Sequence, residues 1–318
     1  MAKSDSSWSR ENITIVGDES MFRVWIENVS QNLYYRKDYS GQFHKSVWGY
    51  KFSLWGVMMQ DRFYPLQMQV LQKEEKSIAV AKECFEELAN FLKECSKNYQ
   101  KPTMYVSIDS GFNSNELIAL VESKGFIPIS VVKDSHLLDL EGETMNFKAL
   151  KALFEQKEKR YLKKQTKKVC DKEQSSDQVP FIWRIKIKYK MHQKEVVVIV
   201  FRLNGSKKIT IAFCSDLNAK AKTIRRHWFA RTSIEQFFRL MKHTLKIQET
   251  KASNAEEFIK KLALVIFKAN FILQLRNRIR KTIKGMKKIT WCDIKRKLAL
   301  DLGVDWLKGQ CKNTTFCI

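Results

Sequence analysis

Hydrophobic positions in the first 132 residues follow two periods, one typical of strands and one typical of helices. Five segments have the alternation or the short apolar run of a β-strand: residues 12–18, 47–59, 62–71, 104–108 and 126–132. Two segments carry apolar residues at helical spacing, residues 77–97 and 113–124. Ser114 is a suitable N-cap for the second helix and Gly125 a suitable stop. The pattern predicts a mixed α/β sheet, in which Pro65 marks an edge or a bulge. Residues 21–46 fit neither period.

A basic helix and three strands are predicted next. The helix covers residues 147–168, and a polar linker follows at residues 174–178. The strands cover residues 181–190, 194–203 and 207–213, with Asn204-Gly205 as a hairpin turn. In the first of these strands, aromatic and aliphatic residues alternate with four cations, Arg184, Lys186, Lys188 and Lys190. One face of the strand therefore packs, and the cations on the other are either solvated or bind phosphates.

A long helix around residues 228–242 combines an apolar side with a charged stripe. Asp216 or Asn218 is expected to cap it. At 100° per residue, four side chains fall within roughly 60° of arc, and Arg239 widens the stripe to about 80°; the four are Trp228, Arg231, Glu235 and Lys242. The Arg231/Glu235 pair alone would be an ordinary surface ion pair. A second helix, with the capping box Ser253/Glu256, is apolar nearly all round and is expected in the core.

The succession strand, strand, strand, helix, strand, helix, strand is that of a ribonuclease-H-like core. We therefore expect an α/β fold, a mixed sheet flanked by helices, with an all-β insertion before the last long helices. The chain divides into four parts: the first part of the core at residues 1–140, the basic helix and β-insertion at 141–214, the completing helices at 215–290 and a tail at 291–318.

The net charge of the chain indicates what class of partner it binds. The 318 residues carry a formal charge of +24, which favours a polyanion. Nucleic acid is favoured over a membrane, because there is no basic amphipathic anchor or lipidation motif and the most apolar run, residues 262–275, is too short to cross a bilayer. The seven cysteines include no Cys-x-x-Cys pair. Without a signal peptide we expect reduced thiols, no zinc site and a cytoplasmic protein.

Two acids stand at predicted strand ends, Asp18 and Asp109. In a ribonuclease-H-like sheet these two strands are neighbours, so both carboxylates are expected at one edge, with Glu235 brought alongside by its helix. Three carboxylates suit a pair of Mg²⁺ ions, with Mn²⁺ as a substitute, that promote phosphodiester cleavage. Glu19 is an alternative first ligand, whereas Asp38 and Asp61 are expected to be surface or turn acids.

The order Arg231-x3-Glu235-x6-Lys242, with Trp228 three residues before the arginine, resembles the Tyr-Arg-Glu-Lys signature of cut-and-paste DDE transposases of bacterial insertion sequences. Asp109-Ser110-Gly111-Phe112 is similar to the family's turn after the second acid, and Asp18-Glu19-Ser20 is similar to a looser motif around the first. The family also places an all-β insertion between its second Asp and its Glu.

The resemblance implies roles for these residues. Asp18, Asp109 and Glu235 are the expected catalytic metal ligands. Arg231 and Lys242 are expected to hold phosphates, and Trp228 to stack on a base or brace a strand end. Arg239, on the same stripe, is also expected to bind DNA. His227 and His243 are expected to pack or to contact phosphate. The implied partner is double-stranded DNA, bound by a homodimer in the bacterial nucleoid.

Two departures leave alternatives open. Trp228 replaces the family's Tyr, and only about a dozen residues precede the first acidic strand, where the family has a helical DNA-binding domain. The chain is therefore a transposase, truncated at its N-terminus or recognising ends by other parts, or a repurposed DNA-binding protein, or a ribonuclease-H-like nuclease without strand transfer.

Overall fold

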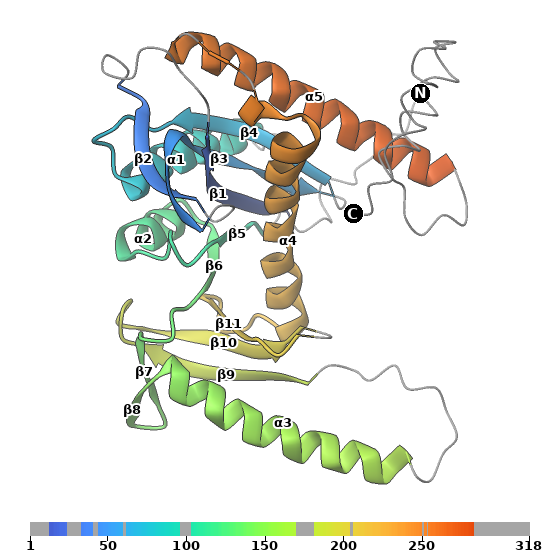
Figure 1. Cartoon of the computed structure of the whole chain (residues 1–318). Coiled ribbons are helices and arrows are strands. Elements are labelled where there is room, and N and C mark those ends of the chain that lie inside the picture. Colours follow the sequence, from blue (N-terminus) through green and yellow to red (C-terminus); the bar gives the residue numbers. More distant parts are fainter. Residues whose placement is uncertain are drawn as a thin grey trace, which may run out of the picture.

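A computed structural model of the protein describes nine stretches of the chain: residues 13–23, 33–40, 44–59, 62–95, 103–169, 181–203, 206–249, 251–252 and 254–282. In these stretches eleven strands form a single mixed sheet with helices on both faces (Figure 1). The α/β class predicted from the sequence is confirmed.

The core of the sheet contains the five predicted strands. They are β1 (Thr14–Phe22), β3 (Lys45–Met59), β4 (Arg62–Val70), β5 (Tyr105–Ile108) and β6 (Ile127–Val131). Their spatial order is β4-β3-β1-β5-β6, with β3 antiparallel to β1 and β4, and with β1, β5 and β6 parallel. This is the ribonuclease-H-like order, and it places the two predicted acidic strands side by side.

An additional strand lies in the stretch without a sequence assignment. β2 (Tyr35–Ser40) pairs with the first part of β3, and β4 pairs with the second part. The register of β3 and β4 shifts between Trp55 and Gly56, next to the Gly56/Pro65 pair. The irregularity predicted at Pro65 is therefore present, because proline cannot donate to a regular ladder.

Helices on one face of the sheet bury the first half of the core. α1 (Ser77–Cys95) and α2 (Asn115–Ser123) pack against this face, with Phe85 and Leu117 fully buried. As predicted, the Ser114 side chain caps α2 by accepting a hydrogen bond from the Leu117 amide at 3.2 Å. The chain leaves α2 through Gly125, whose φ of +83° favours glycine.

The predicted β-insertion continues the same sheet. It contains β8 (Glu143–Asn146), α3 (Phe147–Val169), β9 (Ile182–Tyr189), β10 (Lys194–Arg202) and β11 (Ile209–Cys214). The structure adds β7 (Leu137–Leu140), which precedes the predicted boundary and forms a hairpin with β8. β11 pairs antiparallel with β6, which joins the insertion to the core. α3 runs along β9 and buries Phe147 and Phe154 against it (Figure 1). The hairpin of β7 and β8 was not predicted.

The opposite face of the sheet is crossed by α4 (Ala221–Arg239), which continues into a π-helical turn (Leu240–Thr244) (Figure 1). Neither Asp216 nor Asn218 caps α4, so that prediction is wrong. Instead Lys220 occupies the N-cap position without a side-chain bond, and Asp216 accepts a hydrogen bond from the Asn218 amide at 2.8 Å.

A 3-10 turn (Ile247–Glu249) connects α4 to α5 (Ala255–Thr282). α5 buries Phe258 and Leu262 but leaves another side exposed, so it is not surrounded by core as predicted. Among the residues of α5 whose burial is described, the exposed large hydrophobic side chains are Leu264, Phe267 and Phe271. No helix in the described stretches is both long enough and apolar enough to span a membrane.

Several predicted features lie outside the described residues. They are the leader before residue 12, the turns at Gln60-Asp61 and Asn204-Gly205, the linker at residues 174–178, the capping residue Ser253, the tail after Trp291, and Cys170, Cys292, Cys311 and Cys317. The described cysteines, Cys84, Cys95 and Cys214, form no disulfide, as expected.

Candidate active site

Two neighbouring parallel strands bring Asp18 and Asp109 together. Gly17 of β1 pairs in register with Ile108 of β5, and an aspartate follows each of them. Asp18 does not end its strand as predicted, because β1 continues to Phe22 and buries its last residues against β3. β5 does end at Ile108, however, so the parallel pairing stops level with both acids.

The guanidinium of Arg231 lies among all three predicted acids. Arg231 Nη2 is 2.8 Å from Glu235 Oε1, one helical turn away. Arg231 Nη1 is 3.3 Å from Asp109 Oδ1 and 4.0 Å from Asp18 Oδ2. The structure thus brings Asp18, Asp109 and Glu235 to one place and gives them a shared cation.

Burial and like charge act strongly on Asp18. Removal from water, and then the nearby Asp109 carboxylate, raise the pKa of Asp18 from 3.8 to about 7. Arg231 and the Glu19 amide, which donates to Asp18 Oδ1 at 2.8 Å, oppose this rise. An additional cation beside Asp18 would therefore stabilise its ionised form.

The donor set suits a hard divalent cation once Arg231 moves aside. In the described part of the chain, no three Asp, Glu, His or Cys side chains are arranged to hold a metal ion as they stand. At this site the carboxylates of Asp109 and Glu235 pair with the guanidinium of Arg231. Three carboxylates converging on one cation are nevertheless the oxygen ligands that Mg²⁺ prefers.

A cleft of about 490 Å³ opens beside the acids. Asp18 and Asp109 line it, together with two lysines, Lys51 from β3 and Lys242 from the π-helical turn. Burial lowers the pKa of Lys242 to about 8, although the Asp18 carboxylate opposes the shift. Its Nζ atom lies 5.3 Å from the centre of the Phe22 ring. The predicted Lys242 therefore shares the cleft with the acids.

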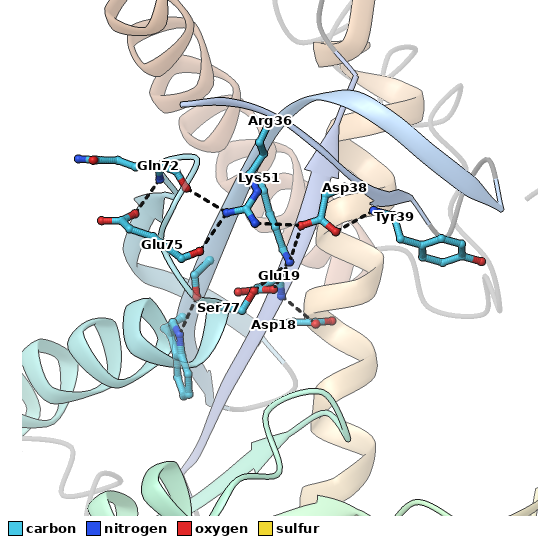
Figure 2. A network of polar contacts seen from close by, with 11 residues as sticks. Asp18, Glu19, Arg36, Asp38, Tyr39, Lys51, Gln72, Glu75 and Ser77 are labelled. Carbon is cyan, nitrogen blue, oxygen red and sulfur yellow. Dashed lines mark hydrogen bonds and ion pairs between the residues drawn. The ribbon is translucent and has the colours of Figure 1, made fainter. Parts of the chain in front are cut away.

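An ion-pair network that was not predicted adjoins the cleft (Figure 2). Its residues Glu19, Lys51 and Ser77 line the cleft. Lys51 Nζ lies 2.9 Å from Glu19 Oε2 and 3.0 Å from Asp38 Oδ2, and donates to Ser77 Oγ at 2.9 Å. Asp38 also lies 3.6 Å from Arg36 Nη2, so it is a network residue and not the plain surface acid expected. Glu19, the alternative ligand, is thus occupied by Lys51. Lys51 lies in the apolar alternation of β3, where a single cation gave no separate signal.

Trp228 lies in the core, where a side chain open to DNA was expected. Trp228 is only 7% exposed and packs edge-on against Phe201, 5.2 Å between ring centres. The prediction that it stacks on a base does not hold in this arrangement, because the ring is part of the core. Arg239 is exposed at the end of α4. His227 packs as predicted, fully buried and hydrogen-bonded to Thr14 Oγ1 at 2.6 Å.

The four cations of β9 separate into two groups. The Arg184 guanidinium donates to the backbone oxygens of Leu217 and Ala219 at 2.7 and 2.9 Å, and Lys190 pairs with Asp139 at 3.0 Å. Arg184 is therefore held within the fold, whereas Lys190 stays exposed and its phosphate contact remains a prediction. Lys186 and Lys188 are exposed and remain available to a polyanion.

α3 contributes cations that were not singled out from the sequence. Lys148, Lys159 and Lys163 are exposed on its outer side, within roughly 60° of arc. None of the ion pairs found among the described residues involves them. The high charge of the helix was visible in the sequence, but its orientation depends on Phe147 and Phe154 packing inward.

Comparisons with known proteins give distant structural likeness. A scan against protein-family models found no match, and a search of curated protein sequences found none. Endonuclease V from Ciona intestinalis, solved with DNA, is 13% identical, with 83% of this chain and 88% of that chain covered and a TM-score of 0.34. NurA nuclease from Sulfolobus solfataricus is 12% identical, with 87% of each chain covered and a TM-score of 0.31. Argonaute from A. aeolicus is 9% identical, with 71% and 25% covered and a TM-score of 0.30.

Proposed function

We propose that the protein is a metal-dependent DNA-cleaving enzyme of the DDE transposase type. The observation that carries the proposal is the convergence of Asp18, Asp109 and Glu235 on one guanidinium, that of Arg231. The order of these residues along the chain and the β-insertion before α4 support the transposase type. The net charge of +24 supports double-stranded DNA as the partner.

The proposed mechanism assigns each residue a task. Asp18, Asp109 and Glu235 would hold Mg²⁺ or Mn²⁺, two ions in the transposase type. When bound, the ions activate a water or a 3′-hydroxyl and stabilise the leaving oxygen. Arg231, which pairs with these acids in the structure, would face the DNA phosphate as a planar donor. Lys242, beside Asp18 in the cleft, contacts the same phosphodiester as a compact point charge.

Asp18 also sets a condition for activity. Its pKa of about 7 means that a proton must leave before the carboxylate can bind a cation. The entering positive charge would lower that pKa and complete the site.

Both ends of an element must be cut together, so we propose a homodimer on DNA, in the bacterial nucleoid.

A nuclease that hydrolyses DNA without joining it would use the same three acids and differ only in product. A repurposed DNA-binding protein would keep the fold and the net charge of +24 without using the acids as metal ligands. That protein would bind DNA with a steep salt dependence but show no chemistry linked to Mg²⁺.

The test uses labelled DNA carrying the flanking ends of the source element, incubated with the full-length protein and Mg²⁺ or Mn²⁺. We expect nicked ends and, later, strand-transfer products, with both absent for Asp109→Asn although DNA binding is retained. Cleavage without joined products would identify the nuclease. Cleavage preserved in Asp109→Asn would overturn the site itself.

A further inference from the structure

The turn that carries Asp109 is fixed at its beginning by the core. The Asp109 carbonyl accepts hydrogen bonds from the Phe112 amide at 3.0 Å and from Ser130 Oγ at 3.3 Å. The Phe112 ring stacks on Trp55 at 5.9 Å between ring centres. At the far end of the turn the Asn113 backbone amide donates to the Ser110 carbonyl at 3.4 Å, and the Asn113 side chain is only 6% exposed.

Both ends of the Asn113 side-chain amide contact the β-insertion, and Nδ2 is shared with the core, where it also donates to the Val131 carbonyl of β6 at 3.4 Å. Asn113 Nδ2 donates to Tyr189 Oη at 3.2 Å, and Asn113 Oδ1 accepts from His192 Nε2 at 3.0 Å. Tyr189 ends β9, and His192 lies in the turn that follows it. The Tyr189 hydroxyl also hydrogen-bonds His136 Nδ1, just before β7. We call Asn113, His136, Tyr189 and His192 the junction cluster.

The side chains of the junction cluster are uncharged, and they are held by hydrogen bonds as well as by ring packing. Tyr189 is fully buried, and burial raises its pKa to about 12. Burial and the Lys194 charge lower the pKa of His192 to about 4, although Glu122 opposes this. The rings already pack on Phe147 and Phe213 at 5.4 Å. Buried polar groups add directional constraints that apolar packing lacks, provided that they are all paired.

We propose that the junction cluster is a positioning device, through which the β-insertion holds the Asp109 turn in its working geometry. Tyr189 and His192 fix Asn113, and the four-residue turn transmits this to Asp109. None of the four side chains lines the acidic cleft, so they act through the turn and not on the reacting atoms. The consequence for catalysis rests on the proposed function, whereas the ordering of the turn does not.

The variants separate hydrogen bonding from packing. Tyr189→Phe keeps the ring and removes the hydroxyl. His192→Gln keeps an N–H donor for Asn113 Oδ1, and His192→Leu removes it. Tyr64→Phe on β4, a half-buried tyrosine remote from the cluster, is the matched control. All are tested in the full chain, with thermal unfolding recorded to confirm that each folds.

Two readouts are measured. Hydrogen exchange of the backbone N–H groups of Phe112 and Asn113 is expected to become about tenfold faster in Tyr189→Phe and His192→Leu. This is the factor expected from losing one buried hydrogen bond. Metal-dependent cleavage is expected to lose about tenfold in kcat with KM for DNA unchanged. His192→Gln and Tyr64→Phe are expected to behave as wild type.

The outcomes distinguish the two proposals. Unchanged exchange in both Tyr189→Phe and His192→Leu would overturn the positioning role. Faster exchange in a protein whose wild type cleaves no DNA would support the junction and reject the proposed function. Faster exchange with an unchanged kcat would also overturn the inference, because the turn would then be loosened without consequence for Asp109.

Discussion

Gly17 of β1 lies directly opposite Ile108 of β5, so that Asp18 and Asp109 leave the paired part of two parallel strands at the same level. The position leaves no room for a larger residue. A Cβ atom on Gly17 would lie 2.5 Å from the ring of Trp55, which is fully buried across the β1–β3 ladder. Placement of the first acid therefore depends on a glycine next to it.

Gly17→Ala is expected to destabilise the protein by about 1–3 kcal/mol, the usual cost of overpacking a core. The indole of Trp55 cannot retreat freely, because it is stacked on Phe112. Urea unfolding measures the difference. Gly111→Ala is the matched control, since a Cβ there meets no atom within 4 Å. Equal urea midpoints for the two variants would show that the Trp55 ring moves away from the added Cβ atom without a loss of stability.

Arg231→Gln is expected to make the protein depend on divalent cations for stability. Without the guanidinium, three carboxylates face one another uncompensated. Thermal unfolding in EDTA should show a lower Tm than wild type, and Mn²⁺ should restore more of the loss than it adds to wild type. Arg239→Gln, an exposed arginine at the end of the same helix, provides the control. An identical response of both variants to Mn²⁺ would argue against a cation site at Arg231.

The raised pKa of Asp18 predicts a pH dependence of stability in the absence of metal. From about pH 4 to about 7 the folded protein keeps a proton on Asp18 that the unfolded chain releases. The unfolded state binds fewer protons there, so this contribution to stability falls as pH rises and levels off above about 7. Asp18→Asn removes the slope.

The measurement compares urea unfolding of wild type and Asp18→Asn at several pH values in EDTA. Taking the difference matters because His192 and His227, whose pKa values are lowered to about 4, contribute in the opposite direction in both proteins. If the difference in the free energy of unfolding between wild type and Asp18→Asn stays constant from pH 4 to 7, the raised pKa of Asp18 is contradicted.

The cations of β9 are expected to divide by role. Lys186→Ala and Lys188→Ala should each weaken DNA binding regardless of sequence and reduce the slope of log K against log salt by roughly one. Arg184→Ala should instead lower Tm, since it leaves the Leu217 and Ala219 carbonyls without their donor. Fluorescence anisotropy over a salt series measures the first effect. A salt slope reduced equally by Arg184→Ala would reject the division.

Periodicity predicted most of the fold because the signals were local. The strand before Asp109, the cap at Ser114 and the stop at Gly125 each depend on a few neighbouring residues. β2 was missed because its exposed alternation is set by pairing with β3, and the end of β1 was missed because Phe22 is buried by the same partner.

The candidate site was predictable only in part. Sequence spacing identified Arg231 and Glu235 on one turn of a helix, but not that the guanidinium reaches Asp109 on another element. Trp228 was misplaced because helical angles alone do not reveal which element packs against each side. Lys51 and Asp38 come together only through the pairing of β2 with β3.

The most direct test of the three-acid site is DNA cleavage by wild type and Glu235→Gln at matched protein concentration, with Mg²⁺, Mn²⁺ or EDTA. Glutamine keeps the shape of the side chain and a polar partner for Arg231, so folding and DNA binding should persist. The account predicts cleavage by wild type only with a divalent cation, and a loss of at least about a hundredfold in Glu235→Gln. Cation-dependent cleavage at an undiminished rate in Glu235→Gln would contradict it.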